Sequence, residues 1–477
     1  MKREWIKNLK DKVGEEVSIN GWVHARRDHG KIVFLDIRDM TSILQVVVVP
    51  GSKAYEIVSD IRNEWVLGLK GKVNKRPDNM INKDSVTGTI ELEASEIKVL
   101  NKAKTTPFEI DKDTSKVDEE LRLKYRYLDL RSERMNKNIT LRHEIVRFIR
   151  EYLYKQEFRE IETPFLTKST PEGAREFIVP SRLFPGEFYV LPQSPQQFKQ
   201  LLMVGGIERY FQIVRCFRDE DQRGDRQPEF TQLDIEMSFI EQEDIFNLVE
   251  PMMIEMVEKL VPEAKITQKP FPRITYKESM EKYKTDKPDL RVDKNDKKEF
   301  AFTWIYDAPM FAESKSEGKL VSVHHPFTSP KDEDEKLLDS KPEDARAYAY
   351  DLALNGFEIF GGSIRIHKRE IQEKVFDILG VSTEEKERRF GHMLEAFEFG
   401  APPHGGIAAG IDRIATIFAG ENAIREAMAF PKTGDARDPM MGAPSNVSED
   451  QLKTVHIELT KEARGKTLKI KDTETND

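Results

Sequence analysis

The alternation of polar and apolar residues between positions 211 and 239 predicts two β-strands, one of which has an unusually polar face. Residues 211–217 form an apolar run with one glutamine and one arginine, and residues 230–239 form a second run after a charged loop. In the second run, every other side chain is polar. These polar positions are Gln232, Asp234, Glu236 and Ser238. Burying four polar groups without partners is costly, so the strand belongs either to a half-solvated hairpin or to a buried sheet that faces a polar ligand. The segment alone favours neither interpretation.

Residues 14–100 contain five short β-type runs in about ninety residues. Turn signals at Asn20-Gly21, Asp28-His29-Gly30 and Lys70-Gly71 separate some of them. This spacing fits a small closed barrel of the OB type, although a barrel without a nucleic-acid function is the alternative. Basic groups gather around the first hairpin beside an aromatic residue, which favours single-stranded nucleic acid through phosphate attraction and base stacking. The group comprises His24, Arg26, Arg27, His29, Lys31 and Arg38, with Phe34 among them.

The remaining periodicity predicts a linker followed by a large α+β domain on an antiparallel sheet. Residues 102–120 have no periodic pattern, whereas residues 141–156 place their apolar side chains on one helical face. Helices and strands then alternate to about residue 430. The expected organisation is a barrel domain (1–103), a linker (104–135), an α+β domain (136–445) with a shortened surface excursion (263–300), and a charged C-terminal extension (446–477).

Composition narrows the class of protein. The chain has 477 residues and a net charge of −9, so any binding to a polyanion must use local basic patches rather than the whole surface. The single cysteine, Cys216, excludes an intrachain disulfide and is expected to be a small buried residue. We find no secretory signal and no apolar run long enough to span a bilayer. These features predict a cytoplasmic protein.

Four separated segments share a chemistry suited to anions. Arg218 and Arg413, with the carboxylates of Asp351 and Glu358, could bind a triphosphate and Mg²⁺, because arginine neutralises phosphoryl oxygens and carboxylates bind the metal. A P-loop and a GxGxxG fingerprint are both absent from the glycine-rich run 405–413. Taken singly, each of these residues is as well explained by a surface salt bridge. The combination is what points to a nucleotide.

Read in order, these segments resemble the active-site motifs of the class II aminoacyl-tRNA synthetases, and within them the bacterial-type aspartyl-tRNA synthetase family. The matching segments are 21–30 (GWVHARRDHG) in the barrel, 141–164 (motif 1), 193–202 (QSPQQFKQLL), 217–234 (FRDEDQRGDRQPEFTQLD, motif 2), 324–330 (HHPFTSP), 350–367 and 405–413 (motif 3). The resemblance extends over nearly the whole chain except 270–300 and the C-terminal tail. The residues of motif 2, RDED followed by DRQPEFTQ, are not expected in an asparaginyl or lysyl enzyme.

The resemblance implies that the chain uses ATP and Mg²⁺ to convert L-aspartate to aspartyl-adenylate and then charges tRNA, as a homodimer. The implied catalytic residues are Arg218, Glu358 and Arg413. The implied aspartate-binding residues are Glu172, Gln196, Lys199, Arg218, Asp234, His324 and Arg365. The implied ATP-binding residues are Arg218, Asp219, Glu220, Gln227, Glu358, Gly410, Ile411, Asp412 and Arg413. The implied metal ligands are Asp351 and Glu358, and the implied anticodon-binding residues are Arg27, His29, Phe34, Gln45 and Glu91.

The chain departs from the family pattern in one region, and the sequence leaves three alternatives to this expectation. The family usually carries a large domain between motif 2 and the histidine pair, whereas here residues 286–291 are followed almost at once by 299–311. His29 after Asp28 is the choice of family members that also charge tRNA(Asn), so we expect both tRNA(Asp) and tRNA(Asn) as substrates; charging of tRNA(Asp) alone is the alternative. An amide ligase that makes asparagine would not need the barrel. A non-catalytic RNA-binding relative would be expected to have lost some of Arg218, Glu358, Arg365 and Arg413.

Overall fold

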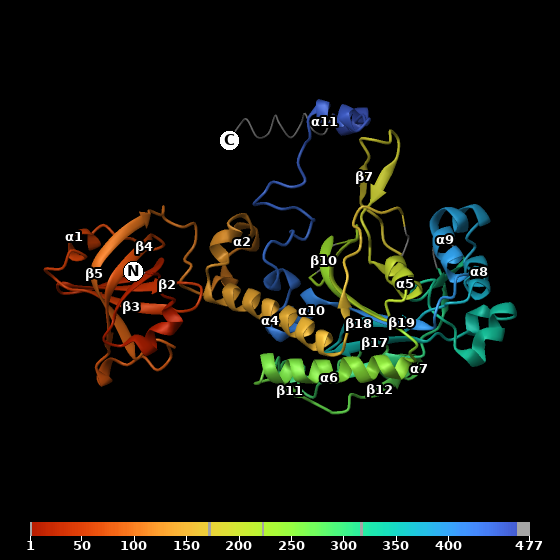
Figure 1. Cartoon of the computed structure of the whole chain (residues 1–477), viewed down its shortest axis with the longest axis horizontal. Coiled ribbons are helices and arrows are strands. Elements are labelled where there is room, and N and C mark those ends of the chain that lie inside the picture. The colour runs from red at the N-terminus through yellow and green to blue at the C-terminus, as the bar shows by residue number, and fades with distance from the viewer. Residues whose placement is uncertain (1, 170–172, 222–223, 315–317, 465–477) are drawn as a thin grey trace. The chain divides into compact units, whose positions relative to one another are not determined.

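The computed structural model of the chain describes residues 2–169, 173–221, 224–314 and 318–464. The chain divides into two compact units, Met1–Asn136 and Lys137–Asp477, whose secondary-structure elements are labelled in Figure 1. Each unit has its own hydrophobic core, so each is described by itself.

The N-terminal unit contains a closed five-stranded barrel with the strand order β1-β2-β3-β5-β4, as predicted for an OB fold. Its strands are β1 (Glu16–His29), β2 (Ile32–Arg38), β3 (Ile43–Val48), β4 (Val66–Lys75) and β5 (Ile90–Asn101). Short helices accompany them: η1 (Ile6–Lys12), α1 (Tyr55–Val58) and η2 (Asp78–Met80). Alternating residues such as Ile19, Leu35 and Leu67 are fully buried and fill the barrel.

Two of the three predicted turns in the barrel are wrong. Gly21 and Gly71 lie inside β1 and β4, where the glycine permits a close approach between strands rather than a turn. A Cβ on Gly21 would lie 2.5 Å from the carbonyl oxygen of Arg38, and one on Gly71 would lie 2.1 Å from that of Glu93. The third signal is correct, because β1 ends at His29 and Gly30 has a φ of 61°.

The segment that follows the barrel has no core of its own but folds into short helices around a buried ion cluster. These helices are η3 (Thr114–Lys116), α2 (Glu119–Lys124) and α3 (Arg126–Asp129). The buried carboxylate of Asp129 accepts hydrogen bonds from Thr114 and Arg126, both at 2.7 Å, and from Arg122 at 3.2 Å. A polar segment can therefore be ordered without an apolar pattern, because its charges are paired.

The second unit is built on an eight-stranded sheet with the order β12-β14-β17-β18-β19-β10-β9-β6. Only the two outermost pairs, β12 with β14 and β6 with β9, are parallel, so the predicted antiparallel sheet is confirmed. The strands are β6 (Arg159–Glu160), β9 (Arg209–Phe217), β10 (Glu229–Ser238), β12 (Arg273–Thr275), β14 (Phe302–Tyr306), β17 (Ala349–Leu354), β18 (Phe357–Ile364) and β19 (His404–Gly410). Three two-stranded sheets pair β7 (Ile178–Pro180) with β8 (Phe188–Val190), β11 (Lys265–Ile266) with β13 (Glu299–Phe300), and β15 (Phe311–Glu313) with β16 (Leu320–Ser322).

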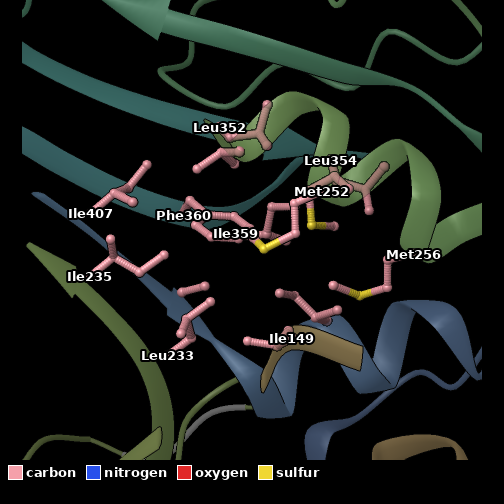
Figure 2. Packing of buried hydrophobic residues seen from close by; sticks show 14 of the residues in the cluster. Ile149, Leu233, Ile235, Met252, Met256, Leu352, Leu354, Ile359, Phe360 and Ile407 are labelled. Atoms are coloured by element: carbon pink, nitrogen blue, oxygen red, sulfur yellow. The ribbon is translucent and has the colours of Figure 1, made fainter. Parts of the chain in front are cut away.

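Helices α4 and α6 share the main hydrophobic core with this sheet. The helices of the chain from α4 onward are α4 (Glu133–Lys155), α5 (Gln196–Val204), α6 (Gln242–Leu260), α7 (Tyr276–Tyr283), α8 (Arg369–Ile378), α9 (Thr383–Phe397), α10 (Ile411–Phe418) and α11 (Glu449–Thr454), with the 3-10 turns η4 (Asp332–Asp339), η5 (Pro342–Asp344) and η6 (Ile424–Ala427). Figure 2 shows Ile149 of α4 and Met252 and Met256 of α6 meeting strand residues such as Ile235 and Ile407. Helix α4 begins eight residues before the predicted start. The prediction missed this first part because it is mostly polar and shows no apolar periodicity.

Strand β10, which carries the alternating polar residues, is buried on both faces. In β10, Leu233 and Ile235 face the core with α6, while Asp234 and Glu236 on the other face are also 0% exposed. The interpretation of this segment as a half-solvated hairpin is therefore wrong. The polar side of β10 must find its partners within the protein or in a ligand.

The predicted surface excursion 263–300 is only partly irregular. It contributes β12 to the main sheet, and Phe271 and Ser279 in it are buried, so this part of the expectation is wrong. The longest irregular part is the connection between α7 and β13. Within the described residues, no helix is both long and apolar enough to cross a membrane.

Candidate active site

A cluster of four buried charges lies on the polar face of β10. Lys199 of α5 places Nζ 2.6 Å from Oδ1 of Asp234 and 3.3 Å from Oε2 of Glu236. Arg365, just after β18, donates from Nε and Nη2 to the two carboxylate oxygens of Glu236, at 3.0 and 3.1 Å. The polar positions of one strand are thus paired with cations from two other elements.

The hydrogen-bond inventory leaves donors available in this cluster. The five N–H groups of Arg365 include two bonded to Glu236, one bonded to Ser363 Oγ at 2.7 Å and one bonded to His325 Nε2. Lys199 donates one hydrogen bond to Asp234 and forms an ion pair with Glu236. Among contacts with described residues, each cation therefore retains at least one N–H, and two such donors are what a carboxylate ligand requires.

Asp234 and Glu236 differ in their electrostatic environment. Burial favours the neutral acid at both positions, but Arg365 and Lys199 together lower the pKa of Glu236. At Asp234, burial outweighs the ammonium group of Lys199 and raises the pKa. Asp234 Oδ2 is buried without a hydrogen-bond partner among the described residues, so it offers an acceptor for a ligand ammonium group.

Two histidines that the sequence analysis did not select complete the cluster. Burial, followed by repulsion from Arg365, lowers the pKa of His325 well below its ordinary value. Because Arg365 only donates, Nε2 of this neutral histidine accepts. Burial lowers the pKa of His404 to about 4, and its Nδ1 donates to the carbonyl of Pro402 at 2.8 Å. Gln196 donates to Gln200 at 3.1 Å, which in turn donates to His404 Nε2 at 3.2 Å.

Glu236 was also missed as a site residue, although its alternation with Asp234 placed it on the polar face. His325 had a signal in the adjacent pair at 324–325. His404 precedes the glycine-rich run 405–413, and it contacts Gln200 only in the folded sheet, where β19 pairs with β10. Arg365 and Gln200, the partners of Glu236 and His404, lie 129 and 204 residues away in sequence, so the sequence pattern alone could not identify them.

Beside the charge cluster lies a cavity of about 270 Å³ that collects most of the predicted nucleotide-binding residues. Its lining includes Arg218, Glu220, Gln227, Glu358, Gly410, Asp412 and Arg413. The guanidinium carbon of Arg218 lies 5.1 Å from the centre of the Phe230 ring, and its Nε is without a hydrogen-bond partner among the described residues. Arg413 donates to the carbonyl of Glu358 and to Asp225 Oδ2 at 3.4 Å.

Two predicted metal ligands face each other across a glycine. A Cβ on Gly361 would lie 3.0 Å from Asp351 Oδ1 and 3.1 Å from Glu358 Oε1, so the glycine lets the two carboxylates approach. Partial enclosure and the charge of Asp351 raise the pKa of Glu358. Although enclosure opposes the charged form, the carboxylate of Asp351, 3.5 Å away, raises the pKa of His324. Among the described residues, no group of three or more histidine, cysteine or acidic side chains could bind a metal without further ligands.

Several other predicted residues have structural contacts that occupy their side chains. Gln227 exchanges two hydrogen bonds with the backbone of Lys432, at 2.7 and 3.0 Å. Asp412 accepts from Arg142 at 2.6 Å and from the Thr231 backbone at 2.7 Å. Ile411 is buried in the hydrophobic core.

Two acids of the charged loop pair with arginines. Asp219 pairs with Arg175 at 3.5 Å, and Glu220 pairs with Arg226 at 3.5 Å. Glu172 lies outside the described residues. Its predicted contact with the substrate amino group, like the ligand contacts of the other residues, stays a prediction.

In the N-terminal unit, the predicted anticodon residues lie along neighbouring strands. Arg27 of β1 is paired in register with Phe34 of β2, and its Nη2 lies 2.9 Å from Asp36 and 3.4 Å from Gln45. Gln45 donates in turn to Glu91 at 2.9 Å. His29 is exposed at the end of β1. These residues form one polar and aromatic strip with Phe34 half-buried.

The fold is that of a class II aminoacyl-tRNA synthetase with an OB-fold domain. Residues 118–434 match the family model described as "tRNA synthetases class II (D, K and N)", and residues 17–100 match that of the OB-fold nucleic acid binding domain. The chain belongs to this class II synthetase family and is an enzyme that forms aminoacyl-tRNA.

Relatives with similar sequences are named Aspartate--tRNA(Asp/Asn) ligase. The protein from Rubrobacter xylanophilus is 43% identical, with 94% of this chain and 95% of the relative covered. The protein from Dictyoglomus turgidum is also 43% identical, with 94% and 96% covered. The first alignment spans 571 positions but includes about 448 residues of this 477-residue chain, so about 120 positions of the alignment have no counterpart here.

Solved structures share the fold at lower sequence identity. Asparaginyl-tRNA synthetase from Pyrococcus horikoshii, complexed with asparaginyl-adenylate, has a TM-score of 0.73 at 22% identity, covering 91% of this chain and 98% of the other. A putative aspartyl-tRNA synthetase from Leishmania major has a TM-score of 0.71 at 20% identity, covering 89% and 92%. The shared fold does not distinguish aspartate from asparagine as the amino acid.

Proposed function

We propose that the protein is an aspartate–tRNA ligase that charges both tRNA(Asp) and tRNA(Asn). The observation that carries the choice of amino acid is the buried cluster of Lys199 and Arg365, with at least one N–H left on each cation. The names of the relatives, with over 40% identity across nearly the whole chain, support the same activity.

In the proposed activation step, an oxygen of the aspartate α-carboxylate attacks the α-phosphorus of ATP, and pyrophosphate leaves. Arg218 neutralises the charge that develops on the α-phosphate, and Arg413 binds the γ-phosphate at the other end of the cavity. Asp234 Oδ2 and Gln196 position the substrate ammonium group. His324 closes over the amino acid. None of these side chains acts as a nucleophile, so the rate enhancement comes from positioning and electrostatic stabilisation.

Asp351 and Glu358 would bind Mg²⁺ together with oxygens of the triphosphate. Their fit rests on the close approach of the two carboxylates beside Gly361 and on Asp351 Oδ1, which makes a 3.5 Å ion-pair contact with His324 but accepts no hydrogen bond from a described residue. The ion would supply a Lewis acid that neutralises phosphate charge. Burial and the neighbouring carboxylate of Asp351 raise the pKa of Glu358, and a bound cation would offset both effects.

The choice of aspartate over asparagine follows from the donor inventory. Lys199 and Arg365 only donate, so the side-chain amide of asparagine would direct an N–H group at a buried N–H donor. A donor stranded in this way costs about 1–3 kcal/mol, and sites of this kind reach discrimination of about 10⁴. A side-chain carboxylate satisfies both donors.

ATP–pyrophosphate exchange without tRNA tests the activation step directly. We expect exchange with L-aspartate and at least about a thousandfold less with L-asparagine. Aminoacylation of purified tRNA(Asp) and tRNA(Asn) transcripts then tests the choice of tRNA. Aspartate charging of tRNA(Asp) alone would support the discriminating alternative, and no exchange with aspartate would contradict the proposed activity.

We also propose that the enzyme is a homodimer in the cytoplasm. The dimer is inferred from the resemblance of residues 141–164 to motif 1, which here forms the C-terminal part of α4 and the strand β6. Sedimentation at micromolar concentration should give about twice the chain mass of 55.3 kDa. A monomer under those conditions would contradict the proposal.

A further inference from the structure

A second cavity adjoins the nucleotide cavity. It has a volume of about 350 Å³ and shares Asp225, Arg413 and Ile424 with the first. Arg413 therefore lies at the boundary between the two cavities. A group released beside Arg413 has the second cavity as its neighbour.

The connection between α7 and β13 supplies the cations of the second cavity. Arg291, Lys294 and Lys297 line it, and with Arg413 they face only two acids, Asp225 and Glu421. The lining residues thus sum to a net charge of +2, or +1 once Asp289, which pairs with Arg291, is included. The nucleotide cavity, by contrast, is lined by four cations and four carboxylates and is balanced.

Two of these cations have charges that no carboxylate contact neutralises. Lys297 donates only to neutral acceptors, the carbonyl of Gly420 at 2.7 Å and Oδ1 of Asn422 at 2.9 Å. Lys294 makes no side-chain hydrogen bond or ion pair with any residue that the structure describes. Arg291 differs, because Asp289 holds it through two hydrogen bonds at 2.8 and 3.0 Å.

The same connection also reaches the nucleotide cavity through Lys287. Relatives with about 120 additional alignment positions are longer than this chain, and the connection is where the sequence predicts the shortening. The connection thus places Lys287 at the first cavity and Arg291, Lys294 and Lys297 at the second. A small polyanion fits this arrangement better than a nucleic-acid duplex, which a 350 Å³ cavity cannot admit.

We propose that the second cavity is a binding site for inorganic pyrophosphate, the product of activation, with Lys294 and Lys297 as its principal cations. The inference rests on the proposed aspartate activation, because that reaction releases pyrophosphate beside Arg413. A net positive cavity next to a balanced one draws the released anion outward from the reaction site. The site controls how readily pyrophosphate leaves and how readily it returns for the reverse reaction.

Calorimetry with inorganic pyrophosphate tests the site, with the full chain saturated by the α,β-methylene analogue of ATP. The analogue occupies the nucleotide cavity, so we expect the wild-type protein still to bind pyrophosphate. Lys294→Ala should weaken this binding about three- to tenfold and Lys294→Glu more, since each change removes charge from a partly screened site. Lys298→Ala is the matched control, because this exposed lysine lies on the same connection but does not line the cavity.

Kinetics separates this site from other roles of the same lysine. In ATP–pyrophosphate exchange, Lys294→Glu should raise KM for pyrophosphate at least threefold and leave KM for ATP and aspartate within twofold. A change in KM for ATP alone would assign the residue to the nucleotide site and overturn the proposal. A change in KM for tRNA alone, measured in aminoacylation, would assign it to tRNA binding and would also overturn the proposal. Equal pyrophosphate binding by wild type and Lys294→Glu overturns it as well. A wild-type protein that binds pyrophosphate but shows no exchange would instead contradict the proposed activity.

Discussion

Arg365 is the residue on which both the structure and the substrate choice of the buried cluster depend. It bridges Glu236, Ser363 and His325 and keeps one N–H for a ligand. We predict that Arg365→Leu lowers aspartate-dependent pyrophosphate exchange by at least about a thousandfold, because a buried donor to the substrate carboxylate is lost. Binding of ATP, measured by calorimetry, should change less than about threefold, since the nucleotide cavity does not include this residue. Near-wild-type exchange would contradict the assignment.

A second variant separates this loss of activity from a loss of folding. Arg365→Leu leaves Glu236 buried beside only one cation, which costs about 3–5 kcal/mol of the free energy of unfolding. Replacing Arg365 and Glu236 together by leucine removes the stranded charge and should recover most of that stability. The double variant should still lack exchange activity. If it regained exchange, the role of Arg365 would be to neutralise Glu236 rather than to bind aspartate.

His404 gives the second unit a specific sensitivity to acid. Its pKa falls from an ordinary 6.5 to about 4 because the ring is buried, and Glu236, Arg365 and His367 are the charged or titratable groups that also act on it. Between these two values the unfolded chain binds a proton that the folded chain does not, so stability falls as the pH falls. The difference amounts to about 2 kcal/mol at pH 5 and almost nothing at pH 7.5.

We therefore predict that His404→Asn flattens the pH dependence of unfolding. Asparagine keeps a donor for the Pro402 carbonyl but has no titrating group. Urea midpoints at pH 7.5 and pH 5.0 should differ less in the variant than in the wild type, by the equivalent of about 2 kcal/mol. His143→Asn, at a histidine outside this cluster, is the control. An unchanged pH dependence in His404→Asn would show that the ring titrates freely in the folded protein.

At the scale of elements, the first turn of α10 joins three segments that are distant in sequence. Asp412 accepts hydrogen bonds from Arg142 of α4 and from the Thr231 backbone of β10. We predict that Asp412→Ala lowers the free energy of unfolding by about 3–5 kcal/mol, because it leaves a partly buried arginine and a buried N–H group unpaired. Thermal or urea unfolding measures this effect.

A surface ion pair provides the control for that prediction. Asp377 lies 2.6 Å from Lys386 but is largely exposed, so Asp377→Ala should cost less than about 1 kcal/mol. The sequence resemblance assigned Asp412 to ATP, and the two roles give different results. A large loss of ATP affinity without a loss of stability would favour direct nucleotide binding over the linking role seen here.

The elements that the sequence predicted best are those whose pattern depends on local geometry. The barrel strands and the two faces of β10 follow from a two-residue alternation, and the antiparallel sheet follows from the order of elements. The turn signals at Gly21 and Gly71 failed because a glycine that permits close strand contact has the same letter as one that permits a turn. Glu236 and His404 were missed as site residues because their burial is created by strands that pair across long sequence separations, and His325 because its partner Arg365 lies 40 residues further along the chain.

At the scale of the whole molecule, amino-acid activation and tRNA recognition are assigned to different units. The charge cluster and both cavities lie within the second unit, and the predicted anticodon strip lies within the first. The net charge of −9 gives no general attraction to tRNA, so recognition has to come from local features such as this strip. Changes to the strip should therefore affect tRNA use and leave the tRNA-independent reaction unchanged.

Phe34→Ala is the sharpest test of that separation. Stacking of a base on an aromatic ring contributes about 1–3 kcal/mol, so KM for tRNA in aminoacylation should rise by a factor between about 5 and 150. Aspartate-dependent pyrophosphate exchange without tRNA should remain within about twofold of wild type. Met40→Ala is the matched control, because this side chain is 71% exposed in the same unit and lies beyond the end of β2 rather than in the strip. Equal effects of the two substitutions on KM for tRNA would remove Phe34 from the recognition surface, and a parallel loss of exchange would show that the two units are functionally coupled.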